Sequence, residues 1–117
     1  MEEAARVYEE ITLRSPEDDQ AFIILGHVYL LSGDYEKAEL AFHNAASIDS
    51  ENLRQILPFY ENLVIQTPDD DQAHSNLGYA RLILGDFAGA REAFQDALSI
   101  NGDNDSALKG LILLETA

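Results

Sequence analysis

An internal repeat of 52 residues constrains the fold of this chain more than any other feature of its sequence. When the sequence is aligned with itself at this offset, residues 1–52 match residues 53–104 without a gap. Identical residues recur at turn, small and aromatic positions, among them Pro16 and Pro68, Gly26 and Gly78, Gly33 and Gly85, and Phe42 and Phe94. Self-similarity at a fixed period indicates that one supersecondary unit is used more than once. The sequence therefore consists of two copies of one unit, followed by a tail of 13 residues.

Each copy contains three stretches in which apolar residues have helical spacing. In the first stretch, Ala4, Val7 and Ile11 recur at intervals of three and four residues, which places them on one helix face. No stretch of the sequence alternates as a strand does, and the short connections favour antiparallel neighbours. We predict an all-α fold with helices over residues 2–14, 17–31, 35–48, 53–66, 71–83, 87–99 and 105–115.

The chemistry of a few residues predicts where these helices end. Gly33 and Gly85 each follow a helical stretch, and glycine suits the left-handed conformation that closes a helix. Acidic triplets at residues 17–19 and 69–71 precede a helix at the same repeat position. Carboxylates at a helix start accept hydrogen bonds from free N–H groups and complement the helix dipole. We therefore expect both triplets to cap helices and not to bind metal.

The second and third helices of each copy carry a recurring pattern of small and aromatic residues. Its members are Phe22, Leu25-Gly26, Tyr29, Gly33-Asp34-Tyr35, Ala38, Phe42 and Ala45, then Leu77-Gly78, Gly85-Asp86-Phe87, Ala90, Phe94 and Ala97. This pattern resembles the tetratricopeptide repeat, W-x₂-L-G-x₂-Y…A-x₃-F…P. The resemblance covers residues 19–52 and 71–104. Small residues let two helices touch closely, and the aromatic rings fill the space beside them.

The first helix of each copy departs from the alternation of two helix types that is regular in this family. Within the irregular helix near residues 53–66, Pro58 lacks the N–H that would bond to the carbonyl of Arg54. We expect a kink there, or a helix that begins near Pro58. The resemblance implies one tetratricopeptide-repeat-like domain over residues 1–117, an α–α superhelix of units 1–52 and 53–104 with a C-terminal helix over 105–117.

The resemblance also implies a non-catalytic scaffold that binds a peptide or helix of a partner protein on its concave face. By position, the expected contact residues are Gln20, His27, Gln72, Ser75, Asn76, Tyr79 and Lys109. Helix 17–31 is apolar nearly all round, which is typical of a helix covered by neighbours on several sides. Its large aliphatic residues are therefore expected to be core, namely Ile23, Ile24, Leu30 and Leu31.

The charge of the chain narrows the class of partner. Seven basic and 22 acidic residues give a formal net charge of −15. Such a surface repels nucleic acid phosphates and anionic membranes, so we expect neither as a partner. It attracts cations, so the expected partner is a net basic, amphipathic protein segment. The acidic start of the sequence is unlike a signal peptide, and no apolar run reaches the length of a membrane span, so a cytoplasmic location is expected.

No motif in the sequence indicates catalysis, a metal or a cofactor. There is no cysteine, the histidines lack HExxH spacing, and no glycine-rich phosphate loop or Gly-x-Ser-x-Gly elbow is present. We therefore expect neither enzymatic activity nor a cofactor. The alternative to a peptide-binding module is a structural segment of a longer solenoid, or a homo-oligomer that assembles through end helices near Val7 and Leu113.

Overall fold

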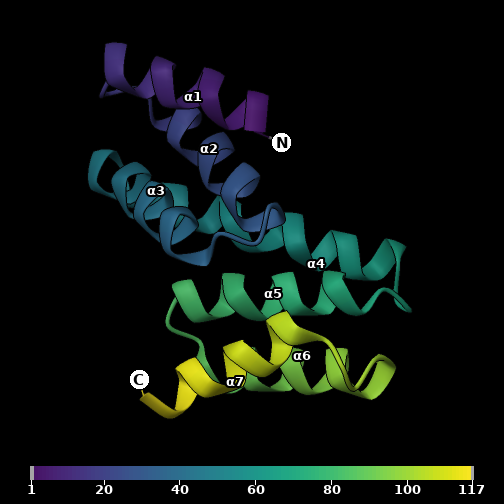
Figure 1. Ribbon diagram of the computed structural model, residues 1–117. Helices are drawn as coiled ribbons and strands as arrows, with labels where there is room; N and C mark the ends of the chain where they lie inside the picture. The colour runs from purple at the N-terminus through teal and green to yellow at the C-terminus, as the bar shows by residue number, and fades with distance from the viewer. Residues whose placement is uncertain (1, 117) are drawn as a thin grey trace. The chain divides into compact units, whose positions relative to one another are not determined.

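The computed structural model describes residues 2–116, and this part of the chain contains seven α-helices, one 3₁₀-helix and no strand (Figure 1). The α-helices are α1 (Glu2–Arg14), α2 (Asp19–Leu31), α3 (Tyr35–Ile48), α4 (Ile56–Gln66), α5 (Asp71–Ile83), α6 (Phe87–Ile100) and α7 (Asp105–Thr116). The 3₁₀-helix η1 (Ser50–Gln55) precedes α4. The prediction of an all-α fold made of repeated helices is therefore confirmed.

The chain forms two compact units, which divide between Ile56 and Leu57. The first unit contains α1, α2, α3 and η1, and the second contains nearly all of α4 together with α5, α6 and α7. This boundary lies four residues after the boundary of the sequence repeat. The single domain over residues 1–117 stays a prediction.

A phenylalanine ring packed on a glycine joins the central helix pair of each unit. A Cβ atom added to Gly26 of α2 would lie 2.5 Å from Cε1 of Phe42 on α3. The same atom on Gly78 of α5 would lie 2.5 Å from Cε1 of Phe94 on α6. Both rings are fully buried. Glycine is required at these two positions because no side chain fits between the helix backbone and the ring.

The turn inside each helix pair has the left-handed glycine that the sequence predicts. Gly33 has φ +86° and Gly85 has φ +85°. In the first turn, the N–H of Asp34 donates to the carbonyl of Tyr29 over 2.9 Å, and the N–H of Gly33 donates to the carbonyl of Leu30 over 3.0 Å. These bonds satisfy carbonyls at the end of α2, as in the Schellman motif.

The acidic triplets cap helices, as predicted from the sequence. The carboxylate of Asp18 accepts from the N–H of Ala21 over 3.1 Å, and the carboxylate of Asp70 accepts from the N–H of Gln72 over 3.0 Å. Because the capping residue lies outside the helix, α2 begins at Asp19, two residues later than the sequence predicts.

The helix expected over residues 53–66 begins three residues later than that range, which agrees with the alternative of a helix that begins near Pro58. Residues 50–55 form η1, and the α-helix begins only at Ile56. Pro58 therefore lies in the first turn of α4, where its missing N–H breaks no helical hydrogen bond. An α-helix that began at Leu53 would instead leave the carbonyl of Arg54 unpaired and in collision with the proline ring.

In each unit, a buried asparagine that follows the second helix of the pair donates a hydrogen bond to the aspartate that begins the first helix of the pair. In the first unit, Nδ2 of Asn52 donates to Oδ2 of Asp19 over 3.0 Å. In the second unit, Nδ2 of Asn104 donates to Oδ2 of Asp71 over 2.8 Å. Hydrogen bonds from Asn104 and then from Asn101 lower the pKa of the Asp71 carboxyl. The two asparagines occupy equivalent positions of the repeat, so both units use the same polar contact.

The ring-on-glycine contact predicts the effect of a single methyl group. Gly26→Ala and Gly78→Ala should each lower the free energy of unfolding by about 1–3 kcal/mol, because the new Cβ displaces a buried ring. Gly102→Ala is the matched control, since its Cβ would meet only the carbonyl of Leu98 at 3.8 Å. Urea denaturation measures all three variants. Equal stability of the Gly26 and Gly102 variants would contradict this reading.

Candidate functional site

Four of the five predicted contact residues of the second unit lie on one side of α5, where their polar atoms bond within the unit. Oγ of Ser75 donates to Oδ1 of Asn104 over 3.0 Å, and Nε2 of Gln72 donates to Oδ1 of Asn76 over 3.1 Å. Ser75 and Asn76 are buried, whereas Gln72 is exposed. The structure therefore gathers these side chains, and uses several of them to hold α5 and α7 together.

Tyr79 is the largest of these α5 residues. Its hydroxyl donates to the carbonyl of Ser106 on α7 over 2.6 Å, and its ring meets the ring of Phe94 edge-on with centroids 5.0 Å apart. Burial, followed by the charge of Asp105, raises the pKa of Tyr79 to about 12. The hydroxyl therefore stays protonated at neutral pH and acts as a hydrogen-bond donor. Lys109, the predicted contact residue on α7, is exposed, and its Nζ lies 2.9 Å from Oδ2 of Asp105.

The equivalent side of α2 in the first unit is more open. Gln20, Ile24, His27 and Leu31 recur every three or four residues and so share one helix face, which we call the α2 face. Gln20 is exposed, Ile24 is 38% exposed and Leu31 is 40% exposed. At the repeat positions of Ile24 and Leu31, Asn76 and Ile83 of α5 are only 6% and 7% exposed.

The expectation that four aliphatic residues of α2 are core is therefore half wrong. Ile23 and Leu30 are buried, as expected, but Ile24 and Leu31 are exposed. Apolar residues on every side of a helix do not show which side its neighbours leave uncovered. The structure leaves open the side that carries two predicted contact residues, Gln20 and His27.

His27 lies at the centre of the α2 face and is half-buried. Its ring meets the ring of Phe42 edge-on, with centroids 5.1 Å apart. Burial lowers the pKa of His27 to about 4, because a charged imidazolium would lose hydration there. At neutral pH this residue is an uncharged, polar-tipped part of the α2 face.

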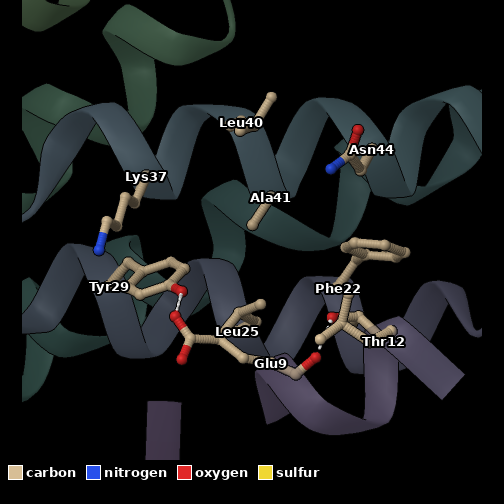
Figure 2. A pocket seen from close by; sticks show the side chains of 10 residues that line it. Glu9, Thr12, Phe22, Leu25, Tyr29, Lys37, Leu40, Ala41 and Asn44 are labelled. Atoms are coloured by element: carbon tan, nitrogen blue, oxygen red, sulfur yellow. Dashed lines mark hydrogen bonds between the residues drawn. The ribbon is translucent and has the colours of Figure 1, made fainter. Parts of the chain in front are cut away.

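A pocket of about 450 Å³ opens on another side of the first unit, among α1, α2 and α3 (Figure 2). We call it the three-helix pocket; its lining residues are Glu9, Thr12, Leu13, Phe22, Leu25, Tyr29, Lys37, Leu40, Ala41 and Asn44. Half of these side chains are apolar. Leu13 on α1 and Leu40 on α3 are 83% and 63% exposed. A volume of this size lies within the range of pockets that bind ligands.

One end of the three-helix pocket is polar. The hydroxyl of Tyr29 on α2 donates to Oε2 of Glu9 on α1, and Nζ of Lys37 on α3 lies 5.6 Å from the centre of the Tyr29 ring (Figure 2). Burial, then the hydrogen bond and charge of Glu9, raise the pKa of Tyr29. The Tyr29 hydroxyl therefore stays protonated at neutral pH and donates to Glu9. Three helices thus contribute one side chain each to this end.

Sequence reasoning missed the three-helix pocket. Tyr29 belongs to the repeat motif, which predicts only a packing role for it. Leu13 and Leu40 belong to no motif. A comparison of the two repeats contains a usable signal, because the second repeat has Arg81 in place of Tyr29 and Glu92 in place of Leu40. Residues needed only for packing would be expected to match at these positions.

No three His, Asp or Glu side chains of residues 2–116 are grouped so that they could hold a metal ion. Likewise, none of the helices in this range combines the length and apolar character needed to cross a membrane.

Comparison with known proteins finds matches in one family. Two sequence models, each described as tetratricopeptide repeat, match residues 2–52 and residues 71–104. Among solved structures, the Sgt2 TPR domain from Aspergillus fumigatus is similar, with 23% identity over 96% of this chain and a TM-score of 0.42. This chain covers 64% of the length of that domain. No curated protein sequence matches the chain.

The burial of His27 predicts a loss of stability in mild acid. Below its ordinary pKa of 6.5 the unfolded chain binds a proton that folded His27 does not bind until about pH 4. Stability from neutral His27 is therefore present above pH 6.5 and declines as the pH falls. At pH 5.5 the loss should be about 1 kcal/mol, allowing for partial exposure.

Urea denaturation at pH 7 and pH 5.5 checks this expectation. The wild-type chain should lose about 1 kcal/mol more than His27→Gln between the two pH values. His43→Gln is the control, because His43 is exposed on α3. Parallel behaviour of the wild type and His27→Gln would contradict it.

Proposed function

The chain belongs to the tetratricopeptide repeat family, and from this premise we propose that it binds an amphipathic, net basic segment of a partner protein on the α2 face. Repeats of this family serve in protein–protein interaction and not in catalysis. The exposure of Ile24 and Leu31 between polar-tipped neighbours is the observation that carries the proposal.

The composition of the α2 face suits an amphipathic ligand. Ile24 and Leu31 offer apolar area that a partner would cover, which is worth about 1.5–3 kcal/mol for each large aliphatic side chain fully buried. Gln20 is exposed; its Nε2 donates to Oε1 of Gln55 over 3.5 Å, and its amide oxygen can accept a hydrogen bond from a peptide backbone. A segment with apolar residues on one side and polar residues on the other satisfies both.

The proposal narrows the concave-face site that the family resemblance implies. Of the residues predicted from the sequence, Gln20, His27, Gln72 and Lys109 keep exposed or half-exposed side chains. Ser75 and Tyr79 are proposed to act by positioning the start of α7, because they bond to Asn104 and Ser106, whereas Asn76 accepts a hydrogen bond from Gln72 on α5 itself.

Charge favours a basic partner. Residues 1–56 contain twelve acidic and four basic side chains. A negative field of this kind speeds the approach of cationic segments and repels acidic ones, and the effect weakens as salt screens it. The contacts on the α2 face itself are apolar and hydrogen-bonding, so charge governs mainly the choice of partner and the rate of association.

A second candidate function is self-association through end helices. Its support is the exposure of large aliphatic side chains on α7, where Leu108 is 44% exposed and Ile112 is 61% exposed. Light scattering on a size-exclusion column measures this directly. A stable oligomer that Ile112→Glu dissociates would favour this second function.

A repeat swap tests the α2 face. In the variant Ile24→Asn, α2 receives the residue that the second repeat has at that position, Asn76. Peptides of 15 residues, selected from a random phage-displayed library on the immobilised chain, serve as probes. We expect selected peptides to be amphipathic and net basic. We expect Ile24→Asn to weaken their binding about tenfold, because the lost apolar contact and the cost of burying an unpaired amide together amount to about 1.4 kcal/mol.

Ile48→Asn is the matched control for this swap, because Ile48 on α3 is 40% exposed and so has similar exposure. Its binding should equal that of the wild type, and both variants should keep their helical circular dichroism. If Ile24→Asn bound every selected peptide as tightly as the wild type, the α2 face would not be the binding surface.

A further inference from the structure

The three-helix pocket of the first unit has lining residues that the fold does not require. At the positions that pack the helix pair, the two repeats agree: Gly26 matches Gly78, and Phe42 matches Phe94. At the pocket, Glu9, Leu25 and Ala41 recur in the second repeat, but seven of the ten lining positions differ. Five of these changes alter the chemistry most: Phe22, Tyr29, Lys37, Leu40 and Asn44 correspond to His74, Arg81, Gly89, Glu92 and Asp96. The same framework therefore forms with a different set of residues, and packing alone does not explain an apolar pocket here.

The exposed leucines of the pocket indicate that its ligand has an apolar group. Leu13 and Leu40 come from α1 and α3 and are more than half exposed, with the apolar interior of Phe22, Leu25 and Ala41 between their helices. Water contact with two large aliphatic side chains beside an apolar pocket is unfavourable, and an inserted apolar side chain would relieve it. The pocket fits a side chain such as leucine or phenylalanine.

The charges at the polar end of the pocket indicate that the ligand also has a basic group. Glu9 bonds to Tyr29 through Oε2, and its Oε1 accepts no hydrogen bond from residues 2–116. An adjoining hollow shares Glu9, Tyr29 and Lys37 with the pocket. Its further charged residues are Glu2, Asp34 and Arg6. Carboxylates thus outnumber cations there, so a basic group is favoured over an acidic one.

From these observations we propose that the three-helix pocket is a second docking site, distinct from the α2 face. Its occupant is a partner-protein segment that inserts one large apolar side chain between Leu13 and Leu40 and places an adjacent lysine or arginine at Glu9. The site lies entirely within the first unit. It does not depend on the α2 face, because its exposed leucines belong to α1 and α3.

The test uses the random 15-residue peptides selected by phage display on the wild-type chain, with Leu40→Glu as the diagnostic variant. This change copies Glu92 of the second repeat and adds a negative charge, which by itself would attract a basic peptide. A loss of binding therefore reports the lost apolar contact. Ile65→Glu is the matched control, because Ile65 on α4 is 75% exposed and receives the same charge.

The proposal expects a class of selected peptides that bind Leu40→Glu at least tenfold more weakly than the wild type, and bind Ile65→Glu and Ile24→Asn as the wild type does. Alanine substitution within these peptides should identify one large apolar residue and a neighbouring lysine or arginine as essential. If every peptide lost binding only through Ile24→Asn, the α2 face would stand and the three-helix pocket would be refuted as a site. Dependence on Leu40 by peptides with an essential acidic residue would overturn the assigned chemistry.

Discussion

Each unit of this protein depends on an aromatic ring that packs directly on a helix backbone. Phe42 covers Gly26, and Phe94 covers Gly78 and also Gly110 of α7, where an added Cβ would meet the ring at 2.3 Å. Because the ring occupies the place of a side chain, two helices approach closely and their remaining faces are free to vary. The alanines beside the rings, which are fully buried, maintain the same close approach.

Because the helix faces outside the ring-on-glycine contact can differ in sequence, the two units share one framework but present different surfaces. In the second unit, polar residues of α5 such as Ser75 and Tyr79 bond to α7 and are buried. In the first unit, the corresponding side of α2 keeps Ile24 and Leu31 exposed, and the three-helix pocket opens elsewhere. The duplicated sequence thus supplies the two diagnostic substitutions, because Ile24→Asn and Leu40→Glu each introduce the residue that the second repeat has at the equivalent position.

The sequence predicts the framework well because the framework depends on local chemistry. The glycines at Gly33 and Gly85 and the caps at Asp18 and Asp70 act within one turn of chain, and their positions repeat. The contact of Asn104 with Asp71 joins residues 33 apart, so its partners are not evident from spacing, although Asn52 recurs at the same repeat position. The exposure of a side chain is harder to predict from the sequence than either kind of contact. Whether Ile24 is covered depends on neighbouring helices, and no pattern within α2 distinguishes it from buried Ile23.

Methyl-resolved NMR of the chain, titrated with a selected peptide whose binding requires Ile24, tests the central claim most directly. The account predicts that the methyl signals of Ile24 and Leu31 shift progressively and saturate with the peptide, whereas the signal of Ile83, the buried equivalent of Leu31 in the second repeat, stays in place. A titration that shifts Ile83 and leaves Ile24 and Leu31 unchanged would show that the ligand binds the second unit, which contradicts the account.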